Sequence, residues 1–437
     1  MPCVTEDDPQ VFYGKEDHQV LWVRLAPSSS YSKEYQSAPI FPQRMDRNYA
    51  IILAASGLNA MVTALLYASL QFMTYEKGHS LVYVGLIGSL PYAGMMVMAY
   101  VWGLVSDWLG KRKGIVVASG VAGSLLFFIY PWLTSIEMLI AVRFVQVCLM
   151  GSVILLIAVA TERFPGEKGK VVGDLNVPLA FGWVVGAATA AYLYQSSQTG
   201  LFFLCGLVGL AAALVLLPLK EDKKQNGDNL LSLRQMLTFR NRRPIYILCL
   251  ATLLLLTGNY IVYSVFPQYL TTSAFNLDKL QIGFLVAGSG LTGMLVFRAA
   301  GKLVDRAGRR KVLIPTYLTY VISWTAYALT QNIYVLAVIW LLPYWCFFTT
   351  SSTAMVSDLT DDRERGRGIG ILNAAINFGN FAGSLLGGFL AASFGYQPAF
   401  AVAAVLVLAA FFVSFATKES NHTAQPSGST PPAPPRT

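Results

Sequence analysis

The sequence predicts an all-α membrane protein with twelve transmembrane helices in two six-helix bundles and with cytoplasmic N- and C-termini. Three observations predict this fold: the apolar composition, the alternation of basic and uncharged loops, and a basic turn that occurs twice. Of the 437 residues, 55% are hydrophobic and only 13% are charged. Soluble domains carry about 25% charged residues, so the composition favours a membrane protein over a soluble enzyme or a nucleic-acid-binding protein.

Apolar segments long enough to span a membrane recur along the whole chain. About 20 apolar residues cross the hydrocarbon core as a helix. The first six predicted spans occupy approximately 48–75, 82–105, 114–133, 135–163, 171–194 and 199–219. The second six occupy approximately 244–270, 280–304, 312–331, 333–359, 367–394 and 396–417, with a kink expected at Pro343.

Three polar regions flank and connect the two predicted bundles, which cover 48–219 and 244–418. We expect residues 1–47 to be a disordered cytoplasmic tail, with translation from Met45 as an alternative. The connector 220–243 has leucines at helical spacing among many cations, which predicts an amphipathic helix on the membrane surface. The Pro-rich segment 419–437 is predicted to be a disordered cytoplasmic tail.

The positions of the cations support this count of spans. Lys and Arg cluster in every second loop, whereas the opposite loops contain only Lys77 and Lys279. Basic loops stay on the cytoplasmic side, so the alternation places both termini in the cytoplasm. The first 45 residues have no long apolar core, so no signal peptide is expected.

A basic turn occurs twice, 198 residues apart. Each copy has a Gly, an Asp four residues later, a second Gly three residues after that, and then three cations. Each copy lies between two apolar segments, so we interpret it as a tight turn between two membrane helices. The candidate gating residues of the two turns are Gly103, Asp107, Gly110, Arg112, Gly301, Asp305, Gly308 and Arg310.

The repeat extends into the predicted helices. Gly85 and Gly283 are also 198 residues apart, and several Gly and polar residues, such as Gln71 and Gln268, recur at an offset of 197. Such a repeat predicts two related halves with a pseudo-two-fold axis along the membrane normal. Gly-x-x-x-Gly spacings at 182–186 and 379–387 predict close helix packing.

These features resemble the major facilitator superfamily over about residues 48–418. The turn 103–113 is similar to the family's loop between helices 2 and 3, and 301–311 to its counterpart between helices 8 and 9. Arg143 followed by Gln146 resembles a helix-4 motif of proton-coupled members, which points toward the drug and metabolite efflux branch. Trp183 stands where drug antiporters normally have Pro, so the similarity to that branch is incomplete.

The resemblance implies a gating role for the first turn, in which Asp107 contacts the start of helix 11 and locks the outward-facing state. We further expect Arg112 to pair with Glu162, and Arg310 to pair with Asp358. The alternative is that the cations of the two turns only fix the topology.

Arg143 lies about eight residues into its predicted helix, inside the hydrocarbon span, where a charge costs about 2.5–3.5 kcal/mol. We therefore expect Arg143, together with Gln146, to face a cavity and to handle substrate or protons. The alternative is a structural arginine that is bonded to helix carbonyls or to Gln146.

No Asp or Glu lies near the middle of any predicted span. A proton-coupled carrier needs a group that titrates during the cycle, and carboxylates usually serve. Asp174, about one turn inside its helix, is the best candidate, although a salt bridge at the membrane rim is an equal alternative. Coupling to protons is therefore open.

The resemblance also implies a central cavity lined mainly by helices 1, 4, 7 and 10. Amide and aromatic side chains of these helices and of helix 11 are candidates to line it, which suits amphipathic organic molecules. The alternative is that many of the aromatics face lipid. The candidates are Asn59, Tyr67, Gln71, Asn259, Tyr263, Gln268, Tyr344, Trp345, Asn373 and Asn377.

The sequence thus predicts a secondary active transporter that works by alternating access and exports drug-like or metabolite-like small organic molecules, with proton antiport as one coupling mode. One alternative is a facilitator, exchanger or uptake carrier for a small organic anion, with Arg143 as its counter-ion. A second alternative is a non-transporting receptor on the same scaffold.

We expect a multi-pass monomer in the cell membrane. Its expected partners are lipid, a small-molecule substrate and protons as a candidate coupling ion, with no nucleic acid. No enzymatic constellation is found. The five cysteines have no paired spacing and no neighbouring His cluster, so neither a disulfide framework nor a metal site is expected, and we expect no cofactor.

Overall fold

The computed structural model describes residues 47–109, 112–151, 168–219, 239, 242–361 and 364–417, without the side chains of Ala99, Asp107 and 168–175. This described part is helical and contains no strand. The predicted tails 1–47 and 419–437 lie outside it apart from Arg47, as does the connector 220–243 apart from Phe239, Arg242 and Arg243.

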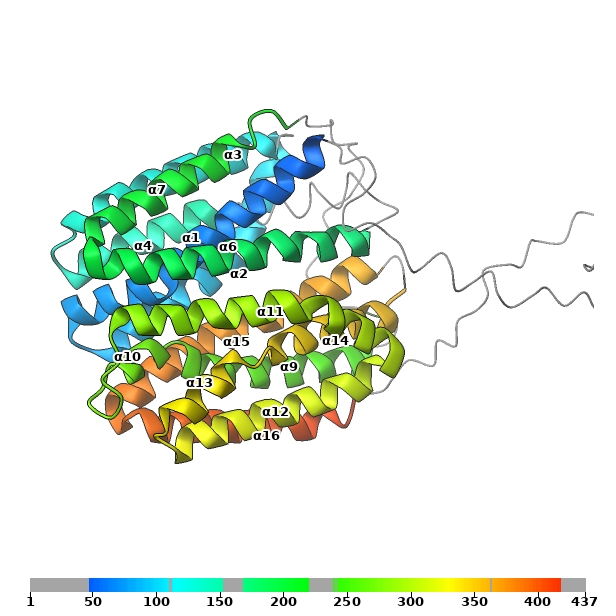
Figure 1. Cartoon of the computed structure of the whole chain (residues 1–437). Helices are drawn as coiled ribbons and strands as arrows, with labels where there is room; N and C mark the ends of the chain where they lie inside the picture. Colours follow the sequence, from blue (N-terminus) through cyan, green and yellow to red (C-terminus); the bar gives the residue numbers. More distant parts are fainter. Residues whose placement is uncertain are drawn as a thin grey trace, which may run out of the picture. The chain divides into compact units, whose positions relative to one another are not determined.

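The first helix group comprises the described helices between residues 47 and 219, coloured blue to green in Figure 1. Its 3₁₀ segment η1 continues α3 directly. The helices are α1 (Arg47–Gly78), α2 (Leu81–Leu109), α3 (Lys113–Leu125), η1 (Leu126–Trp132), α4 (Ile136–Met150), α6 (Lys168–Ser196) and α7 (Gln198–Leu214).

The second helix group comprises the described helices between residues 242 and 417, coloured green to red in Figure 1. They are α9 (Arg242–Tyr263), α10 (Phe266–Leu270), α11 (Lys279–Ala307), α12 (Arg309–Leu329), α13 (Ile333–Leu341), α14 (Tyr344–Leu359), α15 (Arg365–Phe394) and α16 (Tyr396–Ser414).

Within the described residues, ten helical segments are long and apolar enough to cross a membrane. Helix α7 is apolar but shorter, and α4 is followed by residues outside the described part. A multi-pass helical membrane fold is therefore present. The count of twelve spans and the cytoplasmic placement of both termini stay predictions.

Each group has a helix that packs closely against two others: α1 against α6 and α7, and α9 against α15 and α16. The small-residue stripes make the tightest of these contacts. A Cβ at Gly186 would collide with the α1 carbonyl of Met61, and a Cβ at Gly383 with the α9 carbonyl of Thr257. The predicted close packing is confirmed, and these two stripes act within each group rather than between the groups.

Proline interrupts two helices of the second group. The predicted kink at Pro343 is confirmed, because α13 ends at Leu341 and α14 begins at Tyr344. A second break separates α9 from α10 at Ser264 and Val265, just before Pro267. The apolar run 244–270 predicts one continuous span, so this break differs from the prediction.

Helix α12 shows why the second group is closely packed. It buries Tyr317, Tyr320, Trp324 and Tyr327 at intervals of three or four residues, so they lie on one face. Tyr320 contacts Tyr344 of α14, with ring centroids 4.3 Å apart. This aromatic face belongs to the helix core and does not line the cavity described below.

Candidate functional site

A cavity of about 280 Å³ lies between the two helix groups. Helices α1, α2, α4 and α6 of the first group line it, together with α9 and α15 of the second group. Most of its surface is aliphatic or aromatic, with a few amide, hydroxyl and cationic side chains. Such a lining suits an organic molecule with a large apolar part.

The cavity contains five of the predicted site residues, which are Arg143, Asn59, Tyr67, Gln71 and Tyr263. Gln146 is buried behind Arg143 and contacts it. The remaining cavity candidates do not line this cavity in this conformation, so their role stays a prediction: Asn259, Gln268, Tyr344, Trp345, Asn373 and Asn377.

Three of these residues make other contacts. Tyr344 packs in the aromatic face of α12, and Trp345 packs against Phe297 with ring centroids 5.5 Å apart. Asn377 donates to the carbonyl of Asn373 on its own helix at 2.9 Å. Helical rotation, which the sequence pattern of amides did not specify, turns these side chains away from the cavity.

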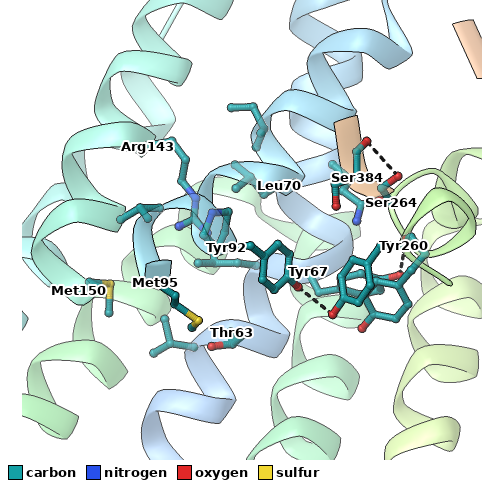
Figure 2. A pocket seen from close by; sticks show the side chains of 18 of the residues that line it. Thr63, Tyr67, Leu70, Tyr92, Met95, Arg143, Met150, Tyr260, Ser264 and Ser384 are labelled. Atoms are coloured by element: carbon teal, nitrogen blue, oxygen red, sulfur yellow. Dashed lines mark hydrogen bonds between the residues drawn. The ribbon is translucent and has the colours of Figure 1, made fainter. Parts of the chain in front are cut away.

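Two tyrosine contacts join the helix groups at the cavity, and Figure 2 shows three of the four tyrosines by label. The Tyr67 hydroxyl donates to the carbonyl of Tyr263 at 2.8 Å. The Tyr92 hydroxyl donates to the Tyr260 hydroxyl at 2.9 Å. The Tyr67 and Tyr263 rings lie 4.4 Å apart. Any molecule in the cavity therefore lies beside side chains that connect the two groups.

The break before α10 explains why Tyr67 finds an acceptor. Pro267 has no N–H group, so the carbonyl of Tyr263, four residues earlier, has no helical donor. A buried carbonyl without a partner is costly. The hydroxyl of Tyr67 from the other helix group satisfies it. Pro267 was the sequence signal for this contact.

Arg143 enters the cavity from α4 and is 8% exposed. Its Nη1 donates to Oε1 of Gln146 at 2.7 Å, and the same oxygen accepts from the Tyr130 hydroxyl at 2.7 Å. Gln146 in turn donates to the carbonyl of Gly123 at 3.2 Å. This network fixes the guanidinium. Arg143 therefore both lines the cavity and is bonded to Gln146, and its handling of substrate or protons stays a prediction.

No carboxylate lines the cavity within the part of the chain that the structure describes. The side chain of Asp174, the predicted candidate for proton coupling, lies outside the described residues. Among the described lining residues, Arg143 is the only one with an ionised side chain. The charge of the described cavity is therefore positive.

The helix groups touch closely at one end of the cavity. We call this the outer end, meaning the end at which α1 finishes at Gly78 and α11 starts at Lys279. A Cβ at Gly85 of α2 would collide with the carbonyl of Ser384 in α15, and a Cβ at Gly283 of α11 would collide with Ala191 of α6. The two glycines of the repeat thus occupy equivalent contacts between the groups.

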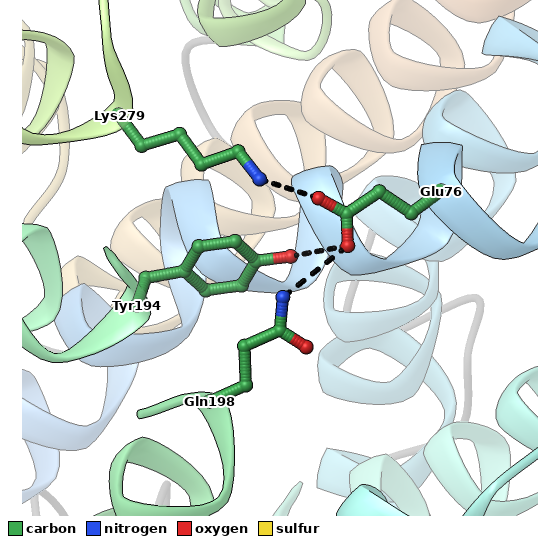
Figure 3. Close-up of polar contacts among 4 residues, drawn as sticks. All are labelled: Glu76, Tyr194, Gln198 and Lys279. Carbon is green, nitrogen blue, oxygen red and sulfur yellow. Dashed lines mark hydrogen bonds and ion pairs between the residues drawn. The ribbon is translucent and has the colours of Figure 1, made fainter. Parts of the chain in front are cut away.

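A polar cluster joins the groups at the same end, as Figure 3 shows. Glu76 of α1 forms an ion pair with Lys279 of α11. Glu76 also accepts hydrogen bonds from the Tyr194 hydroxyl at 3.0 Å and from the Gln198 amide at 3.4 Å. The Lys279 ammonium lies 4.7 Å from the centre of the Tyr194 ring. The sequence predicts Lys279 only as a charge in a loop, so its part in this cluster was not predicted.

The opposite end, which carries the basic turns, is packed differently. Among the described residues, a Cβ at Gly103 or Gly301 would meet no atom within 4 Å. No described helix therefore approaches either glycine closely. Gly110, Glu162 and the side chain of Asp107 lie outside the described residues, so their predicted contacts stay predictions.

The cations of the turns bind helix ends and acids. Lys113 donates to the carbonyl of Leu217 at 2.6 Å, and Arg310 donates to the carbonyl of Phe415 at 2.9 Å. The two acceptors are 198 residues apart, as the two turns are. Cations stabilise helix C-termini in this way. The expected pair of Arg310 with Asp358 is wrong, because Arg309 bonds Asp358 at 2.9 Å.

Several cavity residues were not predicted: Tyr92, Met95, Met150, Ser264 and Ser384 line it in addition to those above. Pro91 and Tyr92 of α2 were detectable, since a proline inside a membrane helix often marks a site where the backbone opens. Trp183, which stands in place of the proline of drug antiporters, also lines the cavity. Its ring centroid lies 5.8 Å from that of Tyr67.

Comparison with known proteins agrees with the fold. The family model of the Major Facilitator Superfamily matches residues 52–256 and 248–437. An uncharacterized MFS-type transporter of Bacillus subtilis, YuxJ, is 25% identical over 77% of this chain and 88% of its own length. A multi-drug resistance efflux pump PmrA homolog of Lactococcus lactis is 24% identical over 82% of this chain and 90% of its own length.

A solved structure has a similar fold. The crystal structure of a bacterial homolog of the human lysosomal transporter Spinster, inward-facing and occupied, superposes with a TM-score of 0.69 at 12% identity. The match covers 84% of this chain and 95% of that one. Proteins of this family are transporters and not enzymes. The chain belongs to the Major Facilitator Superfamily.

Proposed function

We propose that the chain exports small amphipathic organic molecules across the cytoplasmic membrane by alternating access. The observation that carries the proposal is the cavity between two helix groups that are closely packed at its outer end. Its apolar and aromatic lining fits an amphipathic substrate. The similarity to a protein named as a multi-drug resistance efflux pump supports export.

In this proposal the described conformation faces the cytoplasm. The predicted topology places the basic turns, and with them the less closely packed end, on the cytoplasmic side. The glycine contacts and the Glu76 cluster then close the route to the outside. Export requires the two groups to separate at the outer end and to approach at the inner end, as carriers with two related bundles do.

Proton antiport is a further part of the proposal. It rests on Asp174, because the described cavity residues include no carboxylate. A titrating Asp174 would make transport depend on a pH gradient. An exchange mechanism that moves no protons would not depend on the pH gradient.

The test is counterflow in proteoliposomes of the purified full-length chain. We expect radiolabelled chloramphenicol or naphthalene sulfonate to accumulate transiently in vesicles that were preloaded with the unlabelled compound. Cavity variants Trp183→Ala and Tyr92→Ala should slow this exchange at unchanged protein content. Exchange no faster than in protein-free liposomes, for neutral, anionic and cationic compounds alike, would contradict the proposed function.

The same vesicles test the coupling. We expect an imposed pH gradient to increase accumulation in the wild type and to have no effect in Asp174→Asn. Equal accumulation with and without the gradient in the wild type would exclude proton antiport and leave exchange as the mechanism.

A further inference from the structure

Arg143 is a buried cation without a counter-charge in the described part of the chain. One of its nitrogens donates to Gln146, and its Nε has no hydrogen-bond partner. The Gln146 oxygen is neutral and is shared with Tyr130. An uncompensated buried charge is destabilising, so an anion that enters the cavity and pairs with Arg143 would stabilise it.

The rest of the cavity is suited to the apolar body of such an anion. Arg143 lies at one side of the cavity, and Tyr260 lies at the other with Tyr92 and Tyr67 between them (Figure 2). Met95 and Met150 also line the cavity and add flexible apolar surface. An inorganic anion would leave this surface without a partner.

We propose, on the basis of the proposed transport function, that the cavity selects organic monoanions. The substrate would carry one carboxylate or sulfonate that pairs with the Arg143 guanidinium, and an aromatic or other apolar body that packs against Tyr67, Tyr263 and Trp183. Guanidinium groups bind such oxyanions in a bidentate manner. Pairing with Arg143 selects the charge of the substrate in the same way for export and for exchange.

The aromatic lining also allows an opposite selectivity. Tyrosine and tryptophan rings attract organic cations through their π faces. In this cavity a bound cation would share a poorly screened space with Arg143 and with no described carboxylate. Repulsion at low dielectric is strong, so the charge of Arg143 outweighs the attraction of the rings.

The experiment measures binding of three size-matched probes to the purified full-length protein. The probes are naphthalene sulfonate, naphthalene sulfonamide and naphthyl trimethylammonium, which carry negative, zero and positive charge. We expect the sulfonate to bind at least about tenfold more tightly than the sulfonamide, with the ammonium probe weakest. Quenching of tryptophan fluorescence, to which Trp183 contributes, reports binding.

Arg143→Gln should abolish the preference for the anion while the neutral probe keeps its affinity. Arg143→Lys retains the charge and should preserve part of the preference. Arg298→Gln is the matched control, because Arg298 is exposed on α11 outside the cavity and its loss changes the net charge equally. A merely structural Arg143 would instead weaken all three probes by the same factor.

Three outcomes would overturn the inference while the transport function stands: equal affinity for the anionic and neutral probes, tightest binding of the cation, or an unchanged preference in Arg143→Gln. Displacement of the sulfonate probe by an equal concentration of inorganic sulfate would also contradict it. If Arg143→Gln fails to fold, the wild-type series and Arg143→Lys decide. Binding of none of the probes would count against the proposed function itself.

Discussion

At the scale of single residues, the cavity combines one fixed cation with hydroxyls that connect the helix groups. Arg143 was predictable because a charge inside a membrane span is costly and therefore has a partner or a cavity. Ser264 and Ser384 were not predictable, since the rotation of each helix about its axis decides which side chains face the cavity. The amides Asn373 and Asn377 do not line this cavity for the same reason.

Tyr67→Phe tests the contact between Tyr67 and the carbonyl of Tyr263. The substitution keeps the ring but removes the hydroxyl that donates to the carbonyl of Tyr263. That carbonyl has no helical donor, because Pro267 has no N–H group, and so it would be left without a hydrogen bond. We expect a loss of about 1–3 kcal/mol in stability, measured as a lower melting temperature of the purified protein. Tyr100→Phe, at an exposed site, should have no effect. Equal melting temperatures for both variants would contradict this role.

At the scale of helices, the interruptions follow proline and the close contacts follow glycine. The bounds of most helices were predictable from the length of the apolar runs, and the kink at Pro343 from proline chemistry. The break at Ser264 was missed, because the apolar run continues through it and hides the effect of Pro267. The helix that each glycine contacts was not predictable, since a small residue permits close packing but does not determine which helix packs against it.

Gly283→Ala tests the contact of α11 with α6. The new methyl group would overlap the side chain of Ala191, so we expect the outer end to open more often. Labelling of Ser69→Cys, a buried site of α1 in the crevice beside this contact, by a membrane-impermeant maleimide reports the opening. Ala191→Gly in the same chain removes the overlap with the Cβ of Ala191 but leaves its Cα 2.8 Å away, so it should slow the labelling only in part. Gly370→Ala, which meets no atom, is the control.

Slow labelling in Gly283→Ala, equal to that of the control, would show that this contact does not hold the outer end closed.

Glu76→Gln tests the polar cluster at the outer end. The pair with Lys279 is partly exposed, with 41% and 35% of the side-chain surfaces accessible. Exposed pairs contribute up to about 1 kcal/mol, which corresponds to an increase of up to about fivefold in outer opening. The Ser69→Cys labelling rate measures it. Lys77→Met, at the neighbouring lysine, should leave the rate unchanged, whereas Lys279→Met should match Glu76→Gln.

At the scale of the molecule, the repeat in the sequence corresponds to equivalent contacts in space. Gly85 and Gly283 both lie between the helix groups. In each basic turn a cation donates a hydrogen bond to a backbone carbonyl, and the two acceptors, Leu217 and Phe415, occupy corresponding positions in the repeat. The membrane fold and its internal symmetry were therefore predictable from the sequence. Which end of the cavity is closely packed was not predictable from the sequence, because the two conformations of a carrier share one sequence and differ little in free energy.

The most direct test of alternating access is a pair of distance measurements by electron paramagnetic resonance. Spin labels at Thr134 and Ser273 report the outer end, and labels at Trp108 and Lys302 report the opposite end, all at exposed positions. When naphthalene sulfonate or chloramphenicol is added, we predict that the outer distances lengthen as the opposite ones shorten. Two distance distributions that stay fixed, or that change in the same direction, would contradict the mechanism.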